Sequence, residues 1–442
     1  MTTGSMQTLR PKVAIIVEAV MALLVVAAIG RLVYFFIVNG YLPLPFFHDV
    51  DDTFMDWYNT AIWAYRAGTY DLWKAVYPPL SFVFLSLFSI KSCYEDTGRY
   101  ARSCDPIGIY FLAACVVTNF ILAYFIYKKV DSKTALYRSL ALGFGTPMLF
   151  AWERGNLVLP CFTFFMLGHG RLLKSAWARW LCVGMSINFK PYLVLSMAGR
   201  VLRRQWRGAE GCAVAIMLVY AVCLTWFGHG DPMEVYANIN AFVEKGSAPP
   251  PVDSLGYSST FQVLLALLQS PIPVMNYLGS WTLETMERLI PLATRLGQLG
   301  VLGCLAGAIF RPTAVPVHRL AALSLVFLMT GTELGMYSQG FLFFFVFMDR
   351  WNTPGQVVSL MAAYLLCIPF DYQFMGVAHL LKDDYLSNKT VGYNLGLTVG
   401  MFARPALMLI LEYALVAAAI SDLLRGSPVT ATTPARLPTV GV

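Results

Sequence analysis

The sequence predicts an all-α polytopic integral membrane protein, and three observations support that fold class. Of the 442 residues, 57% are hydrophobic and only 13% are charged, and the mean hydropathy is +0.61. Soluble domains carry about 25% charged residues, so these charges are too few to coat a soluble particle of this size. Apolar runs separated by short basic loops recur from Val13 to Leu424. Because helices fill the whole length, residues 1–424 are expected to form one transmembrane domain.

The first apolar segment is expected to remain in the membrane as an anchor. Arg10 and Lys12 precede the stretch from Val13 to Val38, which is too long for a signal-peptide core and lacks a small-residue cleavage site. The N-terminus is therefore placed in the cytoplasm, and the 39–77 loop faces outward. The net charge of +7 does not suggest nucleic acid, because the positive residues sit in short loops, as the positive-inside rule expects.

The remaining apolar segments predict roughly 9 to 12 membrane crossings. Two pieces, 78–90 and 259–270, are shorter than the ~20 residues needed to span and are expected to be re-entrant, tilted or interfacial. Two others are expected to be pairs of half-helices that meet at a polar break, which points to a cavity. The full-length candidates are 13–38, 107–127, 134–151, 157–168, 179–202, 213–228, 286–310, 320–348, 356–370 and 404–424, of which 179–202 and 320–348 are the broken pair.

The topology depends on whether 78–90 crosses the membrane. If it does not, Lys128-Lys129 lies inside and the WERGN turn at 152–156 lies outside; if it does, those assignments reverse. We favour the first version, because it places every polar break on one side. The long loops at 229–258 and 371–403 then also face outward, and the Pro- and Thr-rich tail, 425–442, is expected to be a disordered cytoplasmic segment.

Cysteine usage distinguishes one loop from the rest of the chain. Seven of the nine cysteines lie in apolar segments, where a free Cys is usually a small hydrophobe. Cys93 and Cys104 instead flank the polar loop KSCYEDTGRYARSC. A disulfide between them is expected if that loop lies outside the cytoplasm.

The first outward loop carries a cluster of acids in HDVDDTFMDWYN, residues 48–59. Its four carboxylates are either solvated interface charges or a catalytic group. The aromatic-rich segment 54–73 is expected to lie as an amphipathic helix along the membrane surface. It would hold the carboxylates where a lipid-borne substrate presents its polar head. The four are Asp49, Asp51, Asp52 and Asp56.

Several polar residues stand in or beside apolar segments. Arg154 pairs with Glu153, reaches toward head groups, or serves as a fork for a phosphate. Lys190 lies inside an apolar stretch, where an ammonium costs about 2.5–3.5 kcal/mol and a functional role is the default. The same argument applies to Glu333, beside Tyr337 and Gln339 in GTELGMYSQG. Glu18 and Glu412 stand near helix ends and are expected to have interfacial roles.

Several classes of enzyme find no support. Neither a dinucleotide-binding glycine pattern nor a Walker loop is present, which disfavours nucleotide-driven enzymes. The five histidines show no metal-ligand spacing and no CxxC pair exists, so a zinc enzyme is also disfavoured.

The order of short motifs matches a known group of enzymes. The acidic loop DDTFMDWYNTA continues through Tyr58, Ala61, Gly68 and Tyr70, and YPPL follows at Tyr77 to Leu80. Later come Arg154-Gly155-Asn156, a Gly-rich helix ending in Lys190-Pro191 before Arg203 to Arg207, and Tyr257 to Thr260. The chain resembles the GT-C glycosyltransferases that use polyprenyl-phosphate sugars. Within them it is similar to glycosyltransferase family 87, which holds mycobacterial phosphatidylinositol mannoside mannosyltransferases and a related arabinofuranosyltransferase.

The resemblance implies a GT-C fold and an inverting transfer of a sugar, mannose being favoured, to a lipid-linked or glycan acceptor on the outer face of a bacterial inner membrane. It implies an Asp general base in the first outward loop: position favours Asp52, with Asp51 and Asp56 as competitors. Family members often carry a late His, where this chain has Tyr337 and Gln339. The expected substrate-binding residues are Tyr77, Arg154, Asn156, Lys190, Glu333, Tyr337 and Gln339.

No cofactor is expected, because the sugar–phosphate bond stores the energy of the transfer. Clustering of Asp51 and Asp52 leaves room for a divalent ion, although none is required. The expected partners are the lipid donor, the acceptor and membrane lipids. Three alternatives remain: a flippase or transporter of a lipid-linked saccharide, a polymerase or ligase with a lipid-diphosphate donor, and a structural membrane subunit.

Overall fold

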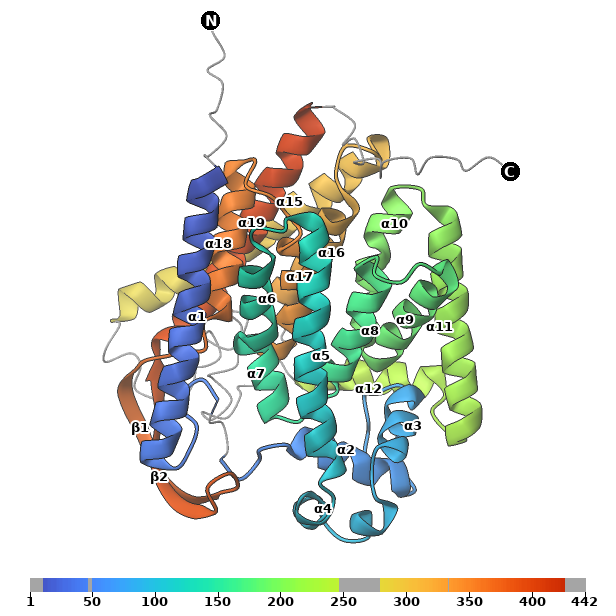
Figure 1. The fold of residues 1–442 in the computed structure, drawn as a ribbon, viewed down its shortest axis with the longest axis vertical. Coiled ribbons are helices and arrows are strands. Elements are labelled where there is room, and N and C mark those ends of the chain that lie inside the picture. The colour runs from blue at the N-terminus through green and yellow to red at the C-terminus, as the bar shows by residue number, and fades with distance from the viewer. Residues whose placement is uncertain (1–10, 47–49, 246–278, 333, 426–442) are drawn as a thin grey trace, which may run out of the picture.

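A computed structural model of the protein describes residues 11–46, 50–245, 279–332 and 334–425 (Figure 1). The predictions for Asp49, Glu333, the apolar piece 259–270, the turn 257–260 and residues 426–442 lie outside these residues.

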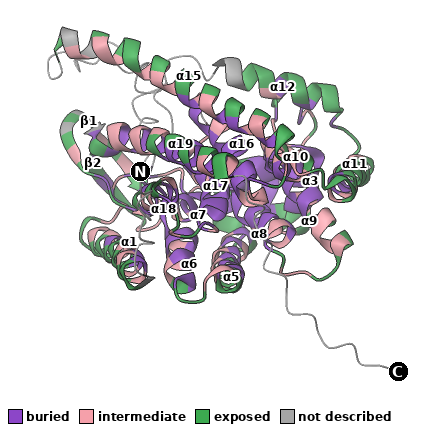
Figure 2. Cartoon of the chain, turned by 90° about the horizontal axis from the view of Figure 1, so that it is seen from above, coloured by how far each residue is buried: buried purple, intermediate pink, exposed green. Residues whose placement is uncertain are grey.

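Five helices are long and apolar enough to cross a membrane, which supports a membrane protein. Large apolar side chains are exposed along them, for example Leu23 and Met217 at 65% and 64%. Figure 2 shows exposed residues along the outer helices and buried residues at the centre of the bundle. Contiguous exposed apolar surface of this kind suits lipid contact. The helices are α1 (Pro11–Asn39), α5 (Ile107–Val130), α11 (Trp206–Phe227), α15 (Ser280–Phe310) and α19 (Val399–Arg425).

Shorter apolar helices form the interior of the bundle. Every residue of the helix that begins at Gln339 is buried, and four of its eight residues are Phe. The predicted segment 134–151 is divided at Gly145, where a Cβ would come within 2.1 Å of the Ala141 carbonyl oxygen. The interior helices are α6 (Ala135–Phe144), α7 (Thr146–Glu153), α8 (Val158–His169), α16 (Val317–Gly331), α17 (Gln339–Val346) and α18 (Pro354–Cys367).

Both predicted helix breaks are confirmed. Helix α9 (Ala176–Phe189) ends before Lys190, whose backbone is extended because the following Pro191 disfavours the helical conformation. The chain then continues as η2 (Pro191–Met197) and α10 (Ala198–Leu202). The second break separates α16 from the short turn η4 (Met336–Ser338), which leads directly into α17.

The segments between α1 and α5 gather at one end of the bundle, opposite the start of α1 and the end of α19 (Figure 1). Helix α3 has nine residues and spans roughly 14 Å, about half of a hydrocarbon core, so this helix is too short to cross by itself. The elements at this end are α2 (Met55–Tyr65), α3 (Pro79–Leu87), η1 (Lys91–Tyr94), α4 (Gly98–Cys104) and α12 (Pro232–Lys245).

Contacts between loops confirm the relative arrangement of the favoured topology. The acidic loop meets the WERGN turn, because the Phe54 N–H donates to the Glu153 carbonyl at 2.7 Å. The basic loops meet at the other end, where the Lys129 Nζ donates to the Arg171 carbonyl at 3.1 Å. The carboxylates and the basic loops therefore lie at opposite ends of the helices.

Two predictions for the acidic end are wrong in detail. The helix expected over 54–73 covers only Met55–Tyr65, and Trp57 and Tyr58 on it are fully buried rather than laid along a surface. The loop expected over 371–403 contains an antiparallel hairpin, β1 (Gln373–Asp384) and β2 (Lys389–Thr398), which departs from the all-α prediction. The hairpin is tied to the acidic loop by a bond from the Tyr385 N–H to the Val50 carbonyl.

The predicted interfacial role of Glu18 is also wrong. Glu18 is fully buried, and its two oxygens accept from the Arg138 guanidinium at 2.7 and 2.8 Å. The Trp351 indole and the Tyr364 hydroxyl also donate to it, at 2.7 and 2.8 Å. The carboxylate thus joins α1, α6 and α18. Glu412 is likewise fully buried, against Gly297 of α15.

Candidate functional site

The acidic loop is seated on the WERGN turn by two backbone hydrogen bonds. Besides the bond from Phe54, the Asp56 N–H donates to the Arg154 carbonyl at 3.0 Å. Gly155 has a φ of +69°, and a Cβ there would lie 2.6 Å from the Phe54 carbonyl oxygen. Only glycine permits both this conformation and this close approach. The turn therefore places the Arg154 and Asn156 side chains beside the carboxylates.

Arg154 pairs with two of the predicted catalytic acids. Its Nη2 lies 2.6 Å from Asp52 Oδ2 and 2.9 Å from Asp56 Oδ1. Asn156 Nδ2 donates to the other oxygen of Asp56 at 2.7 Å. Since one guanidinium faces two carboxylates, the three charges sum to −1. Arg154 thus makes a different ion pair from the one expected with Glu153, and its charge is already compensated.

Asp51 belongs to a neighbouring cluster. Its carboxylate pairs with Arg99 and, at 3.3 Å, with Arg102. Arg102 is 5% exposed, and its Nη1 donates to the Asp51 and Thr53 carbonyls at 2.6 and 2.7 Å. Its guanidinium also lies 3.8 Å from the centre of the Tyr385 ring on the hairpin. Arg102 therefore holds the backbone on both sides of Asp52, a role that sequence reasoning missed.

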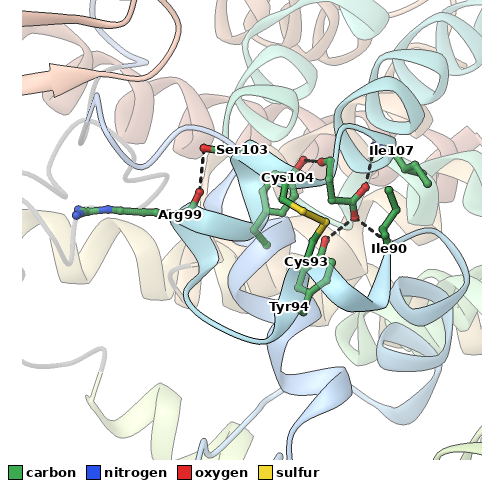
Figure 3. Close-up of a disulfide and its surroundings, with 9 residues drawn as sticks. Ile90, Cys93, Tyr94, Arg99, Ser103, Cys104 and Ile107 are labelled. Atoms are coloured by element: carbon green, nitrogen blue, oxygen red, sulfur yellow. Dashed lines mark hydrogen bonds between the residues drawn. A yellow bond between two sulfur atoms is a disulfide. The ribbon is translucent and has the colours of Figure 1, made fainter.

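The predicted disulfide is present and anchors α4, which carries Arg102. Cys93 and Cys104 are bonded, with their Cα atoms 5.6 Å apart (Figure 3). Next to it, the Tyr94 hydroxyl donates to Asp105 Oδ2 at 2.9 Å, and the Tyr58 hydroxyl donates to the Asp105 carbonyl at 2.6 Å. The disulfide and the Tyr94 bond tie the end of α4 to η1, and the Tyr58 bond ties it to α2, the helix that follows the acidic loop. The other seven cysteines are free and buried, as predicted.

Lys190 lies against two aromatic side chains, those of Tyr77 and Tyr337. Its Nζ lies 3.5 Å from the Tyr77 hydroxyl oxygen, and 4.5 and 5.7 Å from the Tyr77 and Tyr337 ring centres. Burial raises the pKa of Tyr77, and the nearby Asp56 carboxylate raises it further. Tyr77 therefore stands as a neutral hydroxyl between the ammonium and Asp56.

The structure brings most of the predicted site together but leaves two described residues aside, Asp51 in the neighbouring cluster and Gln339. Gln339 is 1% exposed at the start of α17, and neither polar atom of its side chain bonds to a described residue. Tyr337, two positions earlier, stacks on Phe150 of α7 with ring centres 5.8 Å apart. The residues that gather are Asp52, Asp56, Tyr77, Arg154, Asn156, Lys190 and Tyr337.

Glu153 adds a pH-sensitive group beneath the acidic loop. It is 3% exposed and accepts a 3.3 Å hydrogen bond from Thr53. Burial raises the pKa of Glu153 to about 8, against the lowering effect of Arg154 and with a further contribution from Asp56. The group is therefore mainly neutral at pH 7, which avoids a third negative charge beside Asp52 and Asp56.

This pKa predicts a loss of stability with rising pH. The carboxyl ionises near pH 4.5 in the unfolded chain but near pH 8 in the folded one, so between these values the folded state binds more protons. Glu153 should therefore lower the free energy of unfolding as pH rises from about 4.5 to 8, and no further above that. Thermal unfolding of Glu153→Gln between pH 5 and 9 should lack that component. An unchanged pH profile in this variant would contradict the assignment.

Comparison of the chain with protein-family models, curated proteins and solved structures found no match. In the part of the chain that the structure describes, no three His, Cys, Asp or Glu side chains are grouped to hold a metal ion. Asp51 and Asp52 turn their carboxylates to different guanidinium groups.

Proposed function

We propose that the protein is a polyprenyl-phosphate-sugar-dependent glycosyltransferase of GT-C type. One observation carries the proposal: a partly exposed carboxylate, Asp52, lies at one end of a membrane-spanning bundle, where it shares the Arg154 guanidinium with Asp56. A buried lysine, Lys190, contacts Tyr77, a residue on which Asp56 acts electrostatically. A base at the end of a bundle can meet an acceptor hydroxyl in water while the donor's lipid chain stays in the bilayer. The lipid-exposed helices suit such a chain.

Asp52 is the best placed of the three candidate bases. Its side chain is 32% exposed and makes one ion pair, through Oδ2, so Oδ1 has no partner among the described residues. Both oxygens of Asp56 are occupied, by Arg154 and Asn156. Both oxygens of Asp51 face guanidinium groups. A general base needs an accessible lone pair, which favours Asp52.

The proposed reaction is a single inverting displacement. Asp52 accepts the proton of the acceptor hydroxyl as its oxygen forms a bond to the sugar C1. The bond from C1 to the phosphate oxygen breaks, and its electron pair leaves on the polyprenyl phosphate. Positive charge near that oxygen stabilises the leaving group, and Lys190 can supply it. Tyr77 and Tyr337 shield the ammonium from water and offer aromatic surface to the sugar.

The proposed setting is the bacterial inner membrane, with 39–77 as the outward catalytic loop and the basic loops in the cytoplasm. Mannose is the favoured donor sugar, with a glycolipid or glycan as acceptor. No cofactor is needed for this reaction. A flippase, a lipid-diphosphate polymerase or a structural subunit would each behave differently when the isolated protein is supplied with donor and acceptor.

The test is an assay of the purified full-length protein with radiolabelled polyprenyl-phosphate mannose and membrane lipid extract. Transfer of label to an extractable product, with release of polyprenyl phosphate, supports the proposal. Pentosyl and other hexosyl polyprenyl phosphates extend the assay if mannose is not transferred. No turnover with any of these donors would overturn the enzyme class. Transfer from lipid diphosphates alone would indicate the polymerase or ligase alternative.

A further inference from the structure

Three loops at one end of the bundle are strongly basic. They are residues 128–133, 170–180 and 200–210, and together they contain ten Lys or Arg side chains against two acids, Asp131 and Glu210. Their net charge of +8 compares with +7 for all 442 residues. Such a concentration of like charge is unfavourable in a folded chain unless anions lie beside it.

Two hydrogen bonds bring the three loops together, at the end of the bundle opposite α2 and α4 (Figure 1). The Lys129 Nζ, at the end of α5, donates to the Arg171 carbonyl at 3.1 Å. The Arg200 Nη2, on α10, donates to the Gly168 carbonyl at 3.0 Å. Both acceptors lie in the last turn of α8 or just after it. The loops therefore form one continuous surface, which we call the basic surface.

The cations of the basic surface are not compensated by carboxylates of the described residues. None of the ten has a described carboxylate within 4.0 Å. The chain segments that continue from α1 and α19 at this end, 1–10 and 426–442, contain no Asp or Glu in their sequences. Burial lowers the pKa of Arg203, and the nearby charge of Arg171 lowers it further. An anion beside these two guanidinium groups would relieve their repulsion.

Exposed tryptophans flank the basic surface. Trp177, in the first turn of α9, is 70% exposed, and Trp206, the first residue of the spanning helix α11, is 54% exposed. Exposed Trp rings are typical of the boundary between lipid and water. Arg203 stands three residues before Trp206 and therefore lies near the depth of the lipid head groups. The anions at that depth are lipid phosphates, which the planar donor fork of an Arg fits well.

We propose that Arg171 and Arg203, assisted by the other cations of the basic surface, bind the phosphate of an anionic phospholipid head group. The occupant is a lipid and not a soluble phosphate, because Trp206 and α11 place the cations beside acyl chains. Basic groups at the ends of spanning helices attract anionic lipids through their net charge, which zwitterionic lipids lack. In the proposed orientation the bound lipid belongs to the inner leaflet. The inference does not depend on sugar transfer, since the basic surface lies at the end opposite Asp52.

The test measures lipid binding to the full chain in detergent by native mass spectrometry. The probes are short-chain phosphatidylglycerol, short-chain phosphatidylcholine and glycerol 3-phosphate. Phosphatidylglycerol should bind at least tenfold more tightly than the other two. The double variant Arg171→Gln with Arg203→Gln should lower its affinity at least tenfold. The matched control, Lys91→Gln with Lys389→Gln, removes the same charge from exposed positions at the acidic end and should change the affinity less than twofold.

The control separates a local site from attraction by the net charge of the protein. A loss confined to the Arg171 and Arg203 variant supports the site. Equal losses in both double variants, or equal binding of the two lipids by the wild type, would overturn it. Binding of glycerol 3-phosphate as tight as that of phosphatidylglycerol would overturn the lipid identity of the anion. Chromatographic elution and thermal unfolding show whether the double variant is folded, and the single variant Arg171→Gln, at an exposed position, replaces it if it is not.

Discussion

Replacing Asp52 with Asn should lower the rate of sugar transfer by about 10²- to 10⁴-fold, the usual contribution of a general base. Asn keeps the size of the side chain but cannot accept the proton of the acceptor hydroxyl. Because Asp52 is partly exposed and makes a single ion pair with the residues that the structure describes, the fold should survive the change. The measurement is initial rate with the radiolabelled donor, together with donor affinity, which should change little.

Two further variants test whether the loss of rate is specific to Asp52. Asp96→Asn removes an exposed carboxylate at the same end of the molecule and should leave the rate within a factor of two. Asp56→Asn should cost less than Asp52→Asn, because Asp56 acts through its bonds to Arg154 and Asn156. If Asp52→Asn keeps a near-normal rate of transfer while Asp51→Asn or Asp56→Asn loses it, the general base is that other residue and not Asp52.

Breaking the buried ion pair between Glu18 and Arg138 should have the largest effect on stability. Glu18→Gln leaves the Arg138 guanidinium buried without its counter-charge, a change that typically costs about 3–5 kcal/mol. The expected result is a lower thermal unfolding temperature in detergent and poor yield of folded protein. The Arg138 bonds to the Phe347 and Asp349 carbonyls remain, so the loss reports the carboxylate.

The control for this stability test is Glu210→Gln, an exposed carboxylate on α11, which should change the unfolding temperature little. The double variant Glu18→Met with Arg138→Met should recover part of the loss, since it leaves no unpaired charge. If the single and double variants are equally unstable, packing rather than charge compensation governs the site.

Features set by local chemistry could be predicted from the sequence. The break after Phe189 follows from Pro191. The presence and length of the long apolar segments follow from the sequence composition along the chain. The disulfide was predictable because both cysteines stand outside the apolar segments. The proximity of Asp52 to Arg154 was expected only through the favoured topology, and the ion pair between them was not predicted.

Features that depend on distant pairing could not be predicted. Glu18 meets Arg138 across 120 positions, and nothing in the local sequence of either residue indicates the other. The hairpin over 373–398 was missed because its strands contain several glycines, which are depleted in strands. Arg102 looked like one more basic residue of a polar loop, because its importance comes from two backbone carbonyls about 50 positions away.

Under the proposed orientation, the disulfide between Cys93 and Cys104 would couple the maturation of the protein to its topology. In the proposed orientation this loop faces an oxidising compartment, where the bond can form, whereas the cytosol keeps thiols reduced. Until then, α4 lacks its covalent anchor, and Arg102 has no fixed base from which to hold the Asp52 backbone. A chain inserted the wrong way round would thus carry all the same residues with the acidic loop unlatched. In the proposed orientation, oxidation of one cysteine pair completes the support of the acidic loop.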